Sequence, residues 1–346
     1  MALVLFIALA LWLIGMVMKA PVSARLTMIG ALYVGVLIAV SILPDDNSLR
    51  QTLGGDLRSW ALLGGAIALI ATYRMGLKHL RLRALQNQPE QPENQTKAPF
   101  SDVELERYMR HITLREIGGP GQRKLKDARV LVIGAGGLGA PVLQYLAASG
   151  VGTIGVIDDD VVDASNLQRQ VIHTDTSQDM PKVFSAEKAM RAQNPFITVK
   201  PYHRRFDEAC ADLVGEYDLI IDGSDNFDTR YLVNATCVAA QKPLLSAAIT
   251  QWEGQISLYD TAQKTPCYQC VFPTRPADGM VPSCAEAGVA APLPGVLGTM
   301  LAMEAVKHIT GAGVGLGGRL MIYDALYAET RVIKVKKRDD CPICGG

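Results

Sequence analysis

The chain has 346 residues, which suggests about two domains, because a single core rarely grows beyond roughly 250 to 300 residues. Its 34 Lys and Arg residues balance 34 Asp and Glu residues, so the formal net charge is zero. A neutral chain has no global basic field, and direct binding to nucleic acid is therefore not expected.

Three apolar segments near the N-terminus suggest membrane helices. Residues 1–18 carry no charge, and residues 26–43 hold only three polar side chains. Each is close to the length that spans about 30 Å of hydrocarbon. A third run, residues 60–73, is shorter and could instead be a buried helix or a re-entrant segment. We expect an all-α transmembrane region over residues 1–83, with helices at about 2–18, 26–43 and 58–77.

Basic residues between these runs predict their orientation. Lys19 and Arg25 lie between the first two runs, whereas the second connection is rich in aspartate. The basic residues that follow the third run are Arg74, Lys78, Arg81 and Arg83. Because positive loops stay in the cytoplasm, the pattern predicts an external N-terminus, three crossings and a cytoplasmic remainder. A cleaved signal peptide is disfavoured, since the first run lacks a charged start.

Residues 84–100 are rich in Gln, Asn, Pro and Glu and poor in side chains that could pack. Such a composition does not bury enough apolar surface to offset chain entropy, so we expect a flexible linker here. A second domain, residues 101–346, follows it. Ser101 and Glu104 have capping-box spacing and predict a helix that reaches about residue 114.

A glycine turn between a strand and a helix predicts a nucleotide site. Residues 130–133 form a short apolar run that is typical of a buried parallel strand. Gly134, Gly136 and Gly139 follow as G-x-G-x-x-G, before a helix expected at about 138–148. Such glycines let backbone N–H groups approach phosphate oxygens at the helix N-terminus. A second strand, 153–157, leads to Asp158, which is placed to bind ribose hydroxyls.

The same alternation continues along the chain. Helices are expected at 182–193 and 227–240, and strands at 197–201, 219–222 and 244–247. This order predicts an α/β fold, a Rossmann-like, doubly wound, mostly parallel sheet with helices on both faces. Because ligands bind at the carboxyl ends of such strands, the glycine turn, Asp158 and Asp225 should share one crevice. Taken alone, Asp225 could simply cap the helix that follows it.

Two cysteine pairs predict a metal site. Cys267 and Cys270 have the same C-x-x-C spacing as Cys341 and Cys344, and four thiolates can hold one tetrahedral Zn²⁺. A closed four-cysteine zinc knuckle of this kind is structural rather than catalytic. Redox-active thiols are the alternative, which a reducing cytoplasm disfavours.

These motifs closely resemble those of the ThiF/MoeB/HesA family, bacterial relatives of ubiquitin-activating enzymes. The resemblance rests on residues 129–170, which end in Ser-Asn-Leu-Gln-Arg-Gln, on Pro181-Lys182, on Asp-Gly-Ser-Asp-Asn at 222–226 and on the cysteine pairs. It runs from about Ser101 to the end, so residues 1–100 are an addition to the family pattern. Together with the apolar helices, it implies a multi-pass protein of the bacterial inner (cytoplasmic) membrane with a cytoplasmic catalytic domain.

The resemblance implies an adenylyltransferase. Members use ATP and Mg²⁺ to adenylate the C-terminal glycine of a small ubiquitin-like sulfur carrier that ends in Gly-Gly. The acyl-adenylate is then converted to a thiocarboxylate for molybdopterin or thiamine biosynthesis. A cysteine desulfurase or a rhodanese-like protein would supply the sulfur in trans. A homodimer is also expected, because one family arginine reaches ATP from the other subunit.

The resemblance also assigns the site residues. Besides Gly134, Gly136, Gly139 and Asp158, the expected ATP contacts are Gly137, Ser165, Asn166, Leu167, Gln168, Arg169, Lys182, Asp225 and Asn226. Arg169 and Lys182 would neutralise phosphate charge, and Asp225 would hold Mg²⁺. Arg110 would be the arginine from the other subunit. Cys284 could form a covalent intermediate with the carrier.

Three other functions share parts of this pattern. A tRNA-modifying relative would adenylate a carboxylate attached to RNA, which the neutral charge disfavours. An NAD-dependent oxidoreductase would use the same glycine turn, but it leaves residues 165–170 and the cysteine pairs unexplained. A non-catalytic membrane scaffold would keep the fold without needing Arg169, Lys182 and Asp225 together.

Overall fold

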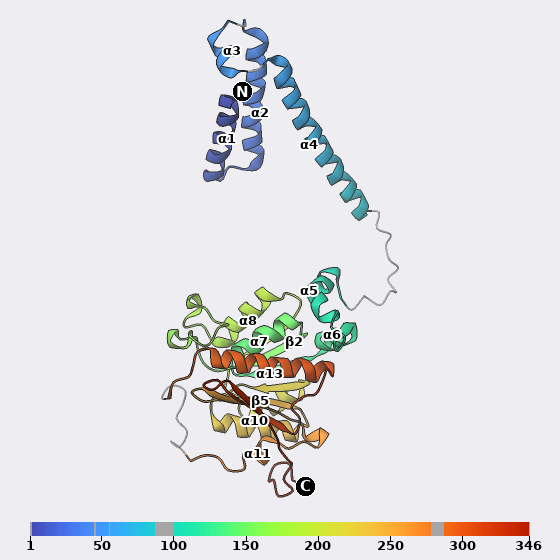
Figure 1. The fold of residues 1–346 in the computed structure, drawn as a ribbon, viewed down its shortest axis with the longest axis vertical. Coiled ribbons are helices and arrows are strands. Elements are labelled where there is room, and N and C mark those ends of the chain that lie inside the picture. Colours follow the sequence, from blue (N-terminus) through green and yellow to red (C-terminus); the bar gives the residue numbers. More distant parts are fainter. Residues whose placement is uncertain (1, 45, 55, 87–99, 278–286, 346) are drawn as a thin grey trace. The chain divides into compact units, whose positions relative to one another are not determined.

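The computed structural model describes residues 2–44, 46–54, 56–86, 100–277 and 287–345, and the chain divides into two compact units (Figure 1). The N-terminal unit is Met1–Thr96 and the C-terminal unit is Lys97–Gly346. Each unit has an apolar core of its own.

The N-terminal unit is helical, as the sequence predicts. Its helices are α1 (Ala2–Val17), α2 (Val22–Ile42), α3 (Ser48–Leu53) and α4 (Leu57–Gln86). Val4 of α1, Val36 and Val40 of α2 and Trp60 of α4 form a buried cluster. The Tyr33 hydroxyl donates to the Trp60 carbonyl oxygen at 2.7 Å, so a polar contact also joins α2 to α4.

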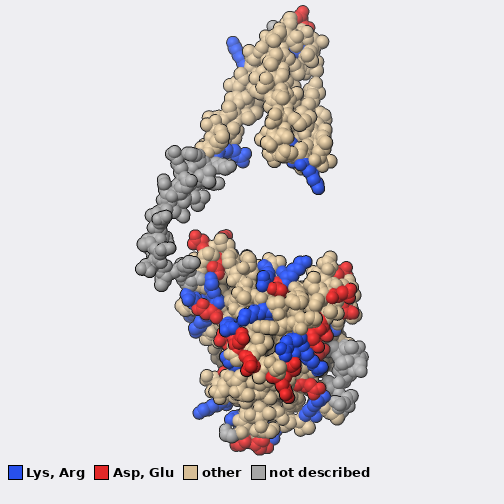
Figure 2. Space-filling model, turned by 180° about the vertical axis from the view of Figure 1, so that it is seen from behind, with Lys and Arg blue, Asp and Glu red and all other residues tan. Residues whose placement is uncertain are grey.

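Two of these helices are long and apolar enough to cross a membrane, α2 and the Leu57–Leu77 part of α4. The apolar helix α1 is shorter. On the face that Figure 2 displays, this unit shows almost no charge between its ends. The α1–α2 connection and the C-terminal end of α4 lie at one end of the unit, and α3 lies at the other (Figure 1). This arrangement suits three crossings, which stay a prediction.

The start of α2 differs from the sequence prediction. The helix begins at Val22 rather than near residue 26, so Arg25 lies inside it. The Arg25 guanidinium donates to the Ala20 carbonyl oxygen through Nε at 2.9 Å and Nη2 at 2.7 Å. It also lies 5.4 Å from the centre of the Trp12 ring. The charge is therefore satisfied locally and does not interrupt the helix.

The end of α4 differs as well, because the helix continues to Gln86 rather than ending near residue 77. Residues 78–86 are mainly Leu, Lys, Arg, Ala and Gln, which favour a helix. Residues 84–86 of the expected linker are therefore helical. Residues 87–99 lie outside the described residues, and the flexibility of the linker stays a prediction.

The C-terminal unit is built on an eight-stranded sheet with the order β3-β2-β1-β4-β5-β6-β7-β8. Strands β1 to β5 pair in parallel, and β6 to β8 extend the sheet antiparallel. The order 3-2-1-4-5 is that of a Rossmann-like sheet, which confirms the predicted α/β fold. The strands are β1 (Arg129–Ile133), β2 (Thr153–Ile157), β3 (Thr198–Tyr202), β4 (Leu219–Asp222), β5 (Leu244–Ile249), β6 (Glu253–Tyr259), β7 (Arg319–Asp324) and β8 (Glu329–Lys334).

Helices cover both faces of this sheet (Figure 1). Val130 and Val132 of β1 belong to one core, which also contains residues of α7, α8 and α13. Leu131 and Ile133 belong to the other core, which contains residues of α9 and α10. Burial on both faces explains why β1 is apolar throughout. These helices are α7 (Gly139–Ser149), α8 (Lys182–Gln193), α9 (Ala211–Gly215), α10 (Phe227–Ala239) and α13 (Pro292–Thr310).

Among the described residues of the C-terminal unit, two helices precede β1 and a short one follows β6. They are α5 (Asp102–Ile112), α6 (Gly118–Asp127) and α11 (Tyr268–Val271). The predicted capping box begins α5, because the Ser101 N–H donates to Glu104 Oε2 at 2.9 Å and Ser101 Oγ accepts from the Glu104 N–H at 3.3 Å. The helix ends at Ile112, close to the expected residue 114.

The turn from β1 into α7 depends on glycine at two positions. Gly134 has a φ of +93°, a left-handed conformation that other residues rarely adopt. A Cβ on Gly139 would lie 1.9 Å from the Gly134 carbonyl oxygen. A Cβ on Gly134 would lie 3.2 Å from the carbonyl oxygen of Gly223, just after β4. The glycines therefore let β1, α7 and the loop after β4 meet without side chains between them.

The substitution Gly139→Ala tests this close approach. The added methyl group would meet backbone atoms, so we expect the free energy of unfolding to fall by about 1 to 3 kcal/mol. Gly215→Ala is the matched control, because a Cβ there meets nothing within 4 Å. It should change the free energy by less than about 1 kcal/mol. Urea unfolding in detergent measures both, and equal effects would contradict the interpretation.

Candidate functional site

Three loops meet at the carboxyl edge of the parallel strands. Ile133, the last residue of β1, is in register with Ile157 of β2 and Asp222 of β4. The Gly134 N–H donates to the Ile157 carbonyl oxygen, and the Gly223 N–H donates to the Ile133 carbonyl oxygen, each at 2.9 Å. The glycine turn, the segment after β2 and the loop after β4 therefore begin side by side.

Asp158 contacts the glycine turn. Its Oδ2 accepts a hydrogen bond from the Ala135 N–H at 2.7 Å, and its Oδ1 accepts one from the Asp160 N–H at 2.9 Å. Burial raises the pKa of the Asp158 carboxyl, although the Ala135 N–H and the Lys182 ammonium favour its ionised form. Both oxygens keep lone pairs that could accept from ribose hydroxyls, which is compatible with the predicted role.

Lys182 is the first residue of α8, and its side chain is only 6% exposed. Its Nζ donates to Asp160 Oδ2 at 2.7 Å, and its backbone N–H donates to the Asp160 carbonyl oxygen at 2.9 Å. The sequence prediction did not include Asp160 in the site. The only sequence signal was its place in a run of three aspartates, Asp158 to Asp160.

Residues 165–170 place a guanidinium near the glycine turn. Asp163 Oδ1 accepts from the Ser165 N–H at 2.8 Å and caps the short turn η1 (Ala164–Asn166). Arg169 Nη2 donates to Asn166 Oδ1 at 2.6 Å. Arg169 Cγ lies 3.7 Å from the position that a Cβ on Gly137 would take. The guanidinium is thus available to a phosphate at the turn. Of the remaining predicted contacts, Ser165 and Gln168 are exposed and Leu167 is half-buried.

Gln170 is a buried side chain at the turn that the sequence prediction left out. Its Nε2 is 3.6 Å from the position that a Cβ on Gly136 would take. Its Oε1 is buried and, within the described part of the chain, has no hydrogen-bond partner. An unpartnered buried acceptor is unfavourable unless a bound group donates to it, and a nucleotide offers such donors. Gln170 is the last residue of the Ser-Asn-Leu-Gln-Arg-Gln motif, and this position was the sequence signal that could have indicated its role.

His173 also supports the turn. Its Nε2 is 2.9 Å from the Ala135 carbonyl oxygen, and its Nδ1 is 2.9 Å from Ser185 Oγ on α8. Because a carbonyl oxygen only accepts, Nε2 carries a proton and donates to it. Burial lowers the pKa of His173, which favours the neutral ring.

A buried polar network fixes the loop after β4. Asp222 Oδ1 accepts from the Ser224 N–H at 2.9 Å and the Ser224 hydroxyl at 2.6 Å, and Oδ2 accepts from the Ser246 hydroxyl at 2.9 Å. Arg230 of α10 donates to the carbonyl oxygens of Ser224 and, at 2.7 Å, of Ala247. Arg230 and Asp222 are both buried and 3.5 Å apart, so each charge has an opposite partner.

This network leaves Asp225 exposed at the start of α10. The helix is capped by Asn226, whose Oδ1 accepts from the Thr229 N–H at 2.9 Å. The idea that Asp225 could be the cap is therefore wrong, because Asn226 occupies that position. The Asp225 carboxylate remains available as an oxygen ligand for Mg²⁺, and the Asn226 amide nitrogen remains available as a donor.

For two predicted catalytic residues, Arg110 and Cys284, the described chain does not test the predicted role. Arg110 is exposed on the last turn of α5, and its side chain has no hydrogen bond or ion pair with any described residue. Cys284 falls within 278–286, outside the described residues. Both roles stay predictions.

The four predicted metal ligands come together as free thiols. The Sγ–Sγ distances are 3.9 Å for Cys267–Cys270, 3.6 Å for Cys267–Cys341 and 3.3 Å for Cys270–Cys344. Tetrahedral Zn–S bonds of about 2.3 Å place sulfurs about 3.8 Å apart, so this cluster could bind one Zn²⁺. Burial opposes ionisation of Cys341, but hydrogen bonds from the backbone N–H groups of Cys344 and Ile343 and from the thiols of Cys267 and Cys270 together lower its pKa to about 7.

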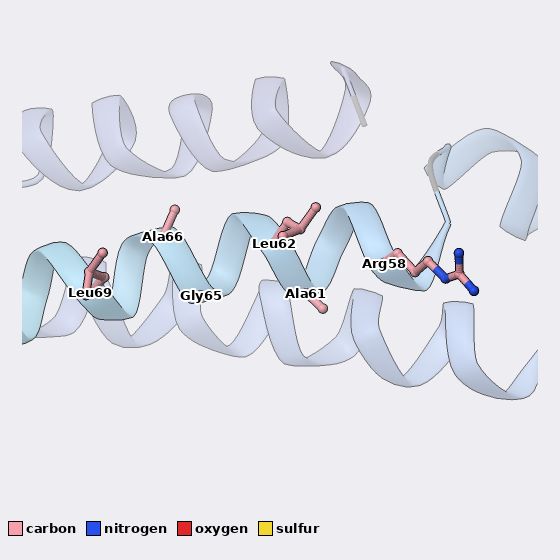
Figure 3. A pocket seen from close by; sticks show the side chains of 6 residues that line it. All are labelled: Arg58, Ala61, Leu62, Gly65, Ala66 and Leu69. Carbon is pink, nitrogen blue, oxygen red and sulfur yellow. The ribbon is translucent and has the colours of Figure 1, made fainter.

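The N-terminal unit holds a groove of about 690 Å³ along α4, far from any of these groups in sequence. Its lining residues are Arg58, Ala61, Leu62, Gly65, Ala66 and Leu69 (Figure 3). Small side chains at 61, 65 and 66 create the hollow, and Arg58 is its one ionisable group. The groove therefore offers apolar contacts rather than the carboxylates, cations and thiols that gather in the C-terminal unit.

The fold and the site define a nucleotide-binding α/β protein with a four-cysteine cluster. The chain belongs to the ThiF family, whose model matches residues 108–343. This confirms the family that the motifs predicted, and the match begins after the N-terminal unit.

Known proteins that resemble the chain agree with this assignment. It is 47% identical to the sulfur carrier protein adenylyltransferase of Thermus thermophilus, over 71% of this chain and 93% of that protein. It is 46% identical to the adenylyltransferase and sulfurtransferase MOCS3 of Bos taurus, over 72% of this chain and 55% of that protein. The crystal structure of E. coli MccB with AMPCPP and MccA is similar at a TM-score of 0.59 and 25% identity, over 66% of this chain and 69% of that chain.

Proposed function

We propose that this protein uses ATP to adenylate the C-terminal glycine of a small ubiquitin-like sulfur carrier that ends in Gly-Gly. One observation carries the proposal: two cations, Arg169 and the buried Lys182, lie with Asp158 around a glycine turn at the carboxyl edge of the sheet. The name of the Thermus relative, of which the chain covers 93%, supports the same reaction.

In the proposed reaction, ATP lies over the glycine turn, and N–H groups at the start of α7 face its phosphates. The terminal carboxylate of the carrier attacks the α-phosphorus, the bond to the oxygen of the β-phosphate breaks, and acyl-adenylate and pyrophosphate form. No general base is needed, because the nucleophile is already ionised. Arg169 and Lys182 stabilise the negative charge on the phosphates. Asp225 would hold Mg²⁺, a hard cation that neutralises phosphate oxygens.

A sulfur donor acting in trans, a cysteine desulfurase or a rhodanese-like protein, completes the proposal. Its persulfide displaces AMP from the acyl carbon and forms an acyl disulfide. A thiol then cleaves the S–S bond, which releases the carrier thiocarboxylate and leaves a disulfide. Cys284 is the candidate for a covalent intermediate with the carrier: its thiolate would attack the acyl-adenylate, displace AMP and form a thioester, from which the persulfide would then displace the Cys284 thiolate. The name of the MOCS3 relative, which joins adenylyltransferase and sulfurtransferase, supports the coupling of the two steps. The product would serve molybdopterin or thiamine biosynthesis.

The proposal includes a structural Zn²⁺ and a homodimer. Cys267, Cys270, Cys341 and Cys344 would hold Zn²⁺ in a closed site, and the Arg338 N–H donates to Cys270 Sγ at 3.5 Å beside it. Arg110 would reach the ATP of the partner subunit. Its exposure and its lack of a partner among the described residues are compatible with that role.

The N-terminal unit would anchor the enzyme in the bacterial inner (cytoplasmic) membrane, with the catalytic domain in the cytoplasm. The lengths of α2 and α4 and the apolar surface of the unit support this anchor. The basic α1–α2 connection and the basic C-terminal part of α4 lie at the same end of the unit, which agrees with a cytoplasmic position for both (Figure 1).

ATP–pyrophosphate exchange tests the adenylation. With a Gly-Gly carrier, wild-type protein should exchange label, and Lys182→Ala should slow exchange about 100- to 1,000-fold, because the phosphates lose a preorganised cation. Lys188→Ala, which removes an exposed lysine from the same helix, should stay within about twofold of wild type. No exchange with any Gly-Gly carrier would refute adenylation, and binding of NAD(H) in place of ATP would favour an oxidoreductase.

Metal analysis tests the cysteine site. Purified protein should contain about one Zn²⁺ per chain, and Cys270→Ser should lose most of it and melt several degrees lower. Cys210→Ala removes another buried cysteine, outside the cluster, and should keep its zinc. Full zinc content in Cys270→Ser, or none in wild type, would contradict a four-cysteine site.

Reporter fusions test the membrane topology. An alkaline phosphatase fused after Arg83 should be inactive in the cytoplasm, and one fused after Pro44, between α2 and α3, should be active outside it. A green fluorescent protein at the same positions should give the reverse pattern. An active phosphatase after Arg83 would reject three crossings with an external N-terminus.

A further inference from the structure

We propose that Asp160 is a positioning residue for adenylation, which holds the ammonium group of Lys182 in place at the nucleotide site. The inference rests on the proposed function, because Lys182 is taken to meet the phosphates of ATP. Its basis is the 2.7 Å contact between Lys182 Nζ and Asp160 Oδ2. The two side chains lie 22 residues apart in the sequence, and the fold brings them together.

The burial of Lys182 makes a charged partner necessary. The Lys182 side chain is 6% exposed, whereas that of Asp160 is 67% exposed. A buried ammonium is unfavourable without an opposite charge and hydrogen-bond acceptors. Asp160 supplies both and keeps one side of its carboxylate in solvent, so its own desolvation is small. The pair is thus placed at the boundary between the protein interior and the space above the glycine turn.

Several carboxylates lie near Lys182, but Asp160 is the one that accepts from its ammonium group. The carboxylate oxygens of Asp158, Asp159 and Asp160 lie within 4.8 Å of one another. Asp158 accepts from the N–H groups of Ala135 and Asp160, and Asp163 accepts from the N–H and hydroxyl of Ser165. Among the described residues, Asp160 is the only side chain with a hydrogen bond to Lys182 Nζ.

Backbone contacts join the segment that contains Asp160 to the segment that contains Lys182. The Lys182 N–H donates to the Asp160 carbonyl oxygen at 2.9 Å, and Val161 forms an antiparallel bridge with Pro181. The Val162 N–H donates to the Met180 carbonyl oxygen at 2.9 Å. The segments therefore stay paired when the Asp160 carboxylate is altered. What the carboxylate adds is the direction and the counter-charge of the Lys182 ammonium.

The Lys182 ammonium group keeps donors for phosphate oxygens while it contacts Asp160. An ammonium group has three N–H donors, and Asp160 occupies one of them. The other two can meet phosphate oxygens while the carboxylate fixes the position of the nitrogen. A misplaced charge would lose most of its value, because stabilisation of the transition state depends on groups that are oriented before the reaction. Asp160 thus acts through Lys182 and need not touch ATP.

A double-mutant cycle tests this inference. In wild type, Asp160→Asn should lower kcat of ATP–pyrophosphate exchange about 10- to 100-fold, because the ammonium is no longer held. In Lys182→Ala, the same substitution should cause almost no further loss, since the residue through which it acts is gone. Asp160→Glu should recover part of the rate. Asp159→Asn, an exposed neighbour of the same charge, should stay within about twofold of wild type.

The outcomes separate the two claims. An equal loss from Asp160→Asn with and without Lys182 would overturn the positioning role, and so would an unchanged rate in Asp160→Asn alone. If wild type exchanged no label with any carrier, adenylation would fail instead. Calorimetry would then measure the Kd for ATP in the same four proteins. Coupling between the effects of the Asp160 and Lys182 substitutions on this Kd would uphold the inference, and additive effects would overturn it.

Discussion

Both backbone groups of Ala135, inside the glycine turn, are held by side chains from other parts of the chain. Asp158 accepts from its N–H at 2.7 Å, and His173 donates to its carbonyl oxygen at 2.9 Å. The contact between Gly139 and the Gly134 carbonyl leaves no space for a side chain in the same turn. These contacts fix the N-terminus of α7, on which the proposed phosphate binding would depend. The conformation of the turn is therefore determined by contacts within the protein itself.

The same contacts connect the turn to the helix that carries Lys182. The second nitrogen of His173 lies 2.9 Å from the Ser185 hydroxyl on α8, and Lys182 is the first residue of that helix. The Lys182 ammonium in turn favours the ionised form of Asp158. Packing and charge thus support the same geometry, since a shift of α8 would disturb both the histidine contact and the carboxylates around the lysine.

The parallel half of the sheet could be predicted because it is buried on both faces. Continuous apolar runs marked β2 and β4 at their observed bounds. Strand β8 was missed, since all its residues are exposed and no apolar pattern marks it. Helix α13 was not predicted, and its Pro294 and Gly298 are residues that disfavour a helix interior. In the fold, a Cβ on Gly298 would lie 2.5 Å from the Leu138 carbonyl oxygen, so this glycine allows α13 to pack on the turn.

In the candidate site, too, some residues could be predicted from the sequence and others could not. Motif residues were predictable, whereas partners set by tertiary pairing, such as Asp160, were not. Beside Cys267, the Tyr268 N–H donates to Asn234 Oδ1 of α10 at 2.8 Å, and Val238 near the end of α10 packs on the cluster. From Asn226 to Val238 the helix spans about 18 Å. A metal bound there would be too distant to polarise a phosphate beside Asp225. In the proposed reaction the cluster would instead act through α10, by holding the helix and with it the loop that contains Asp225.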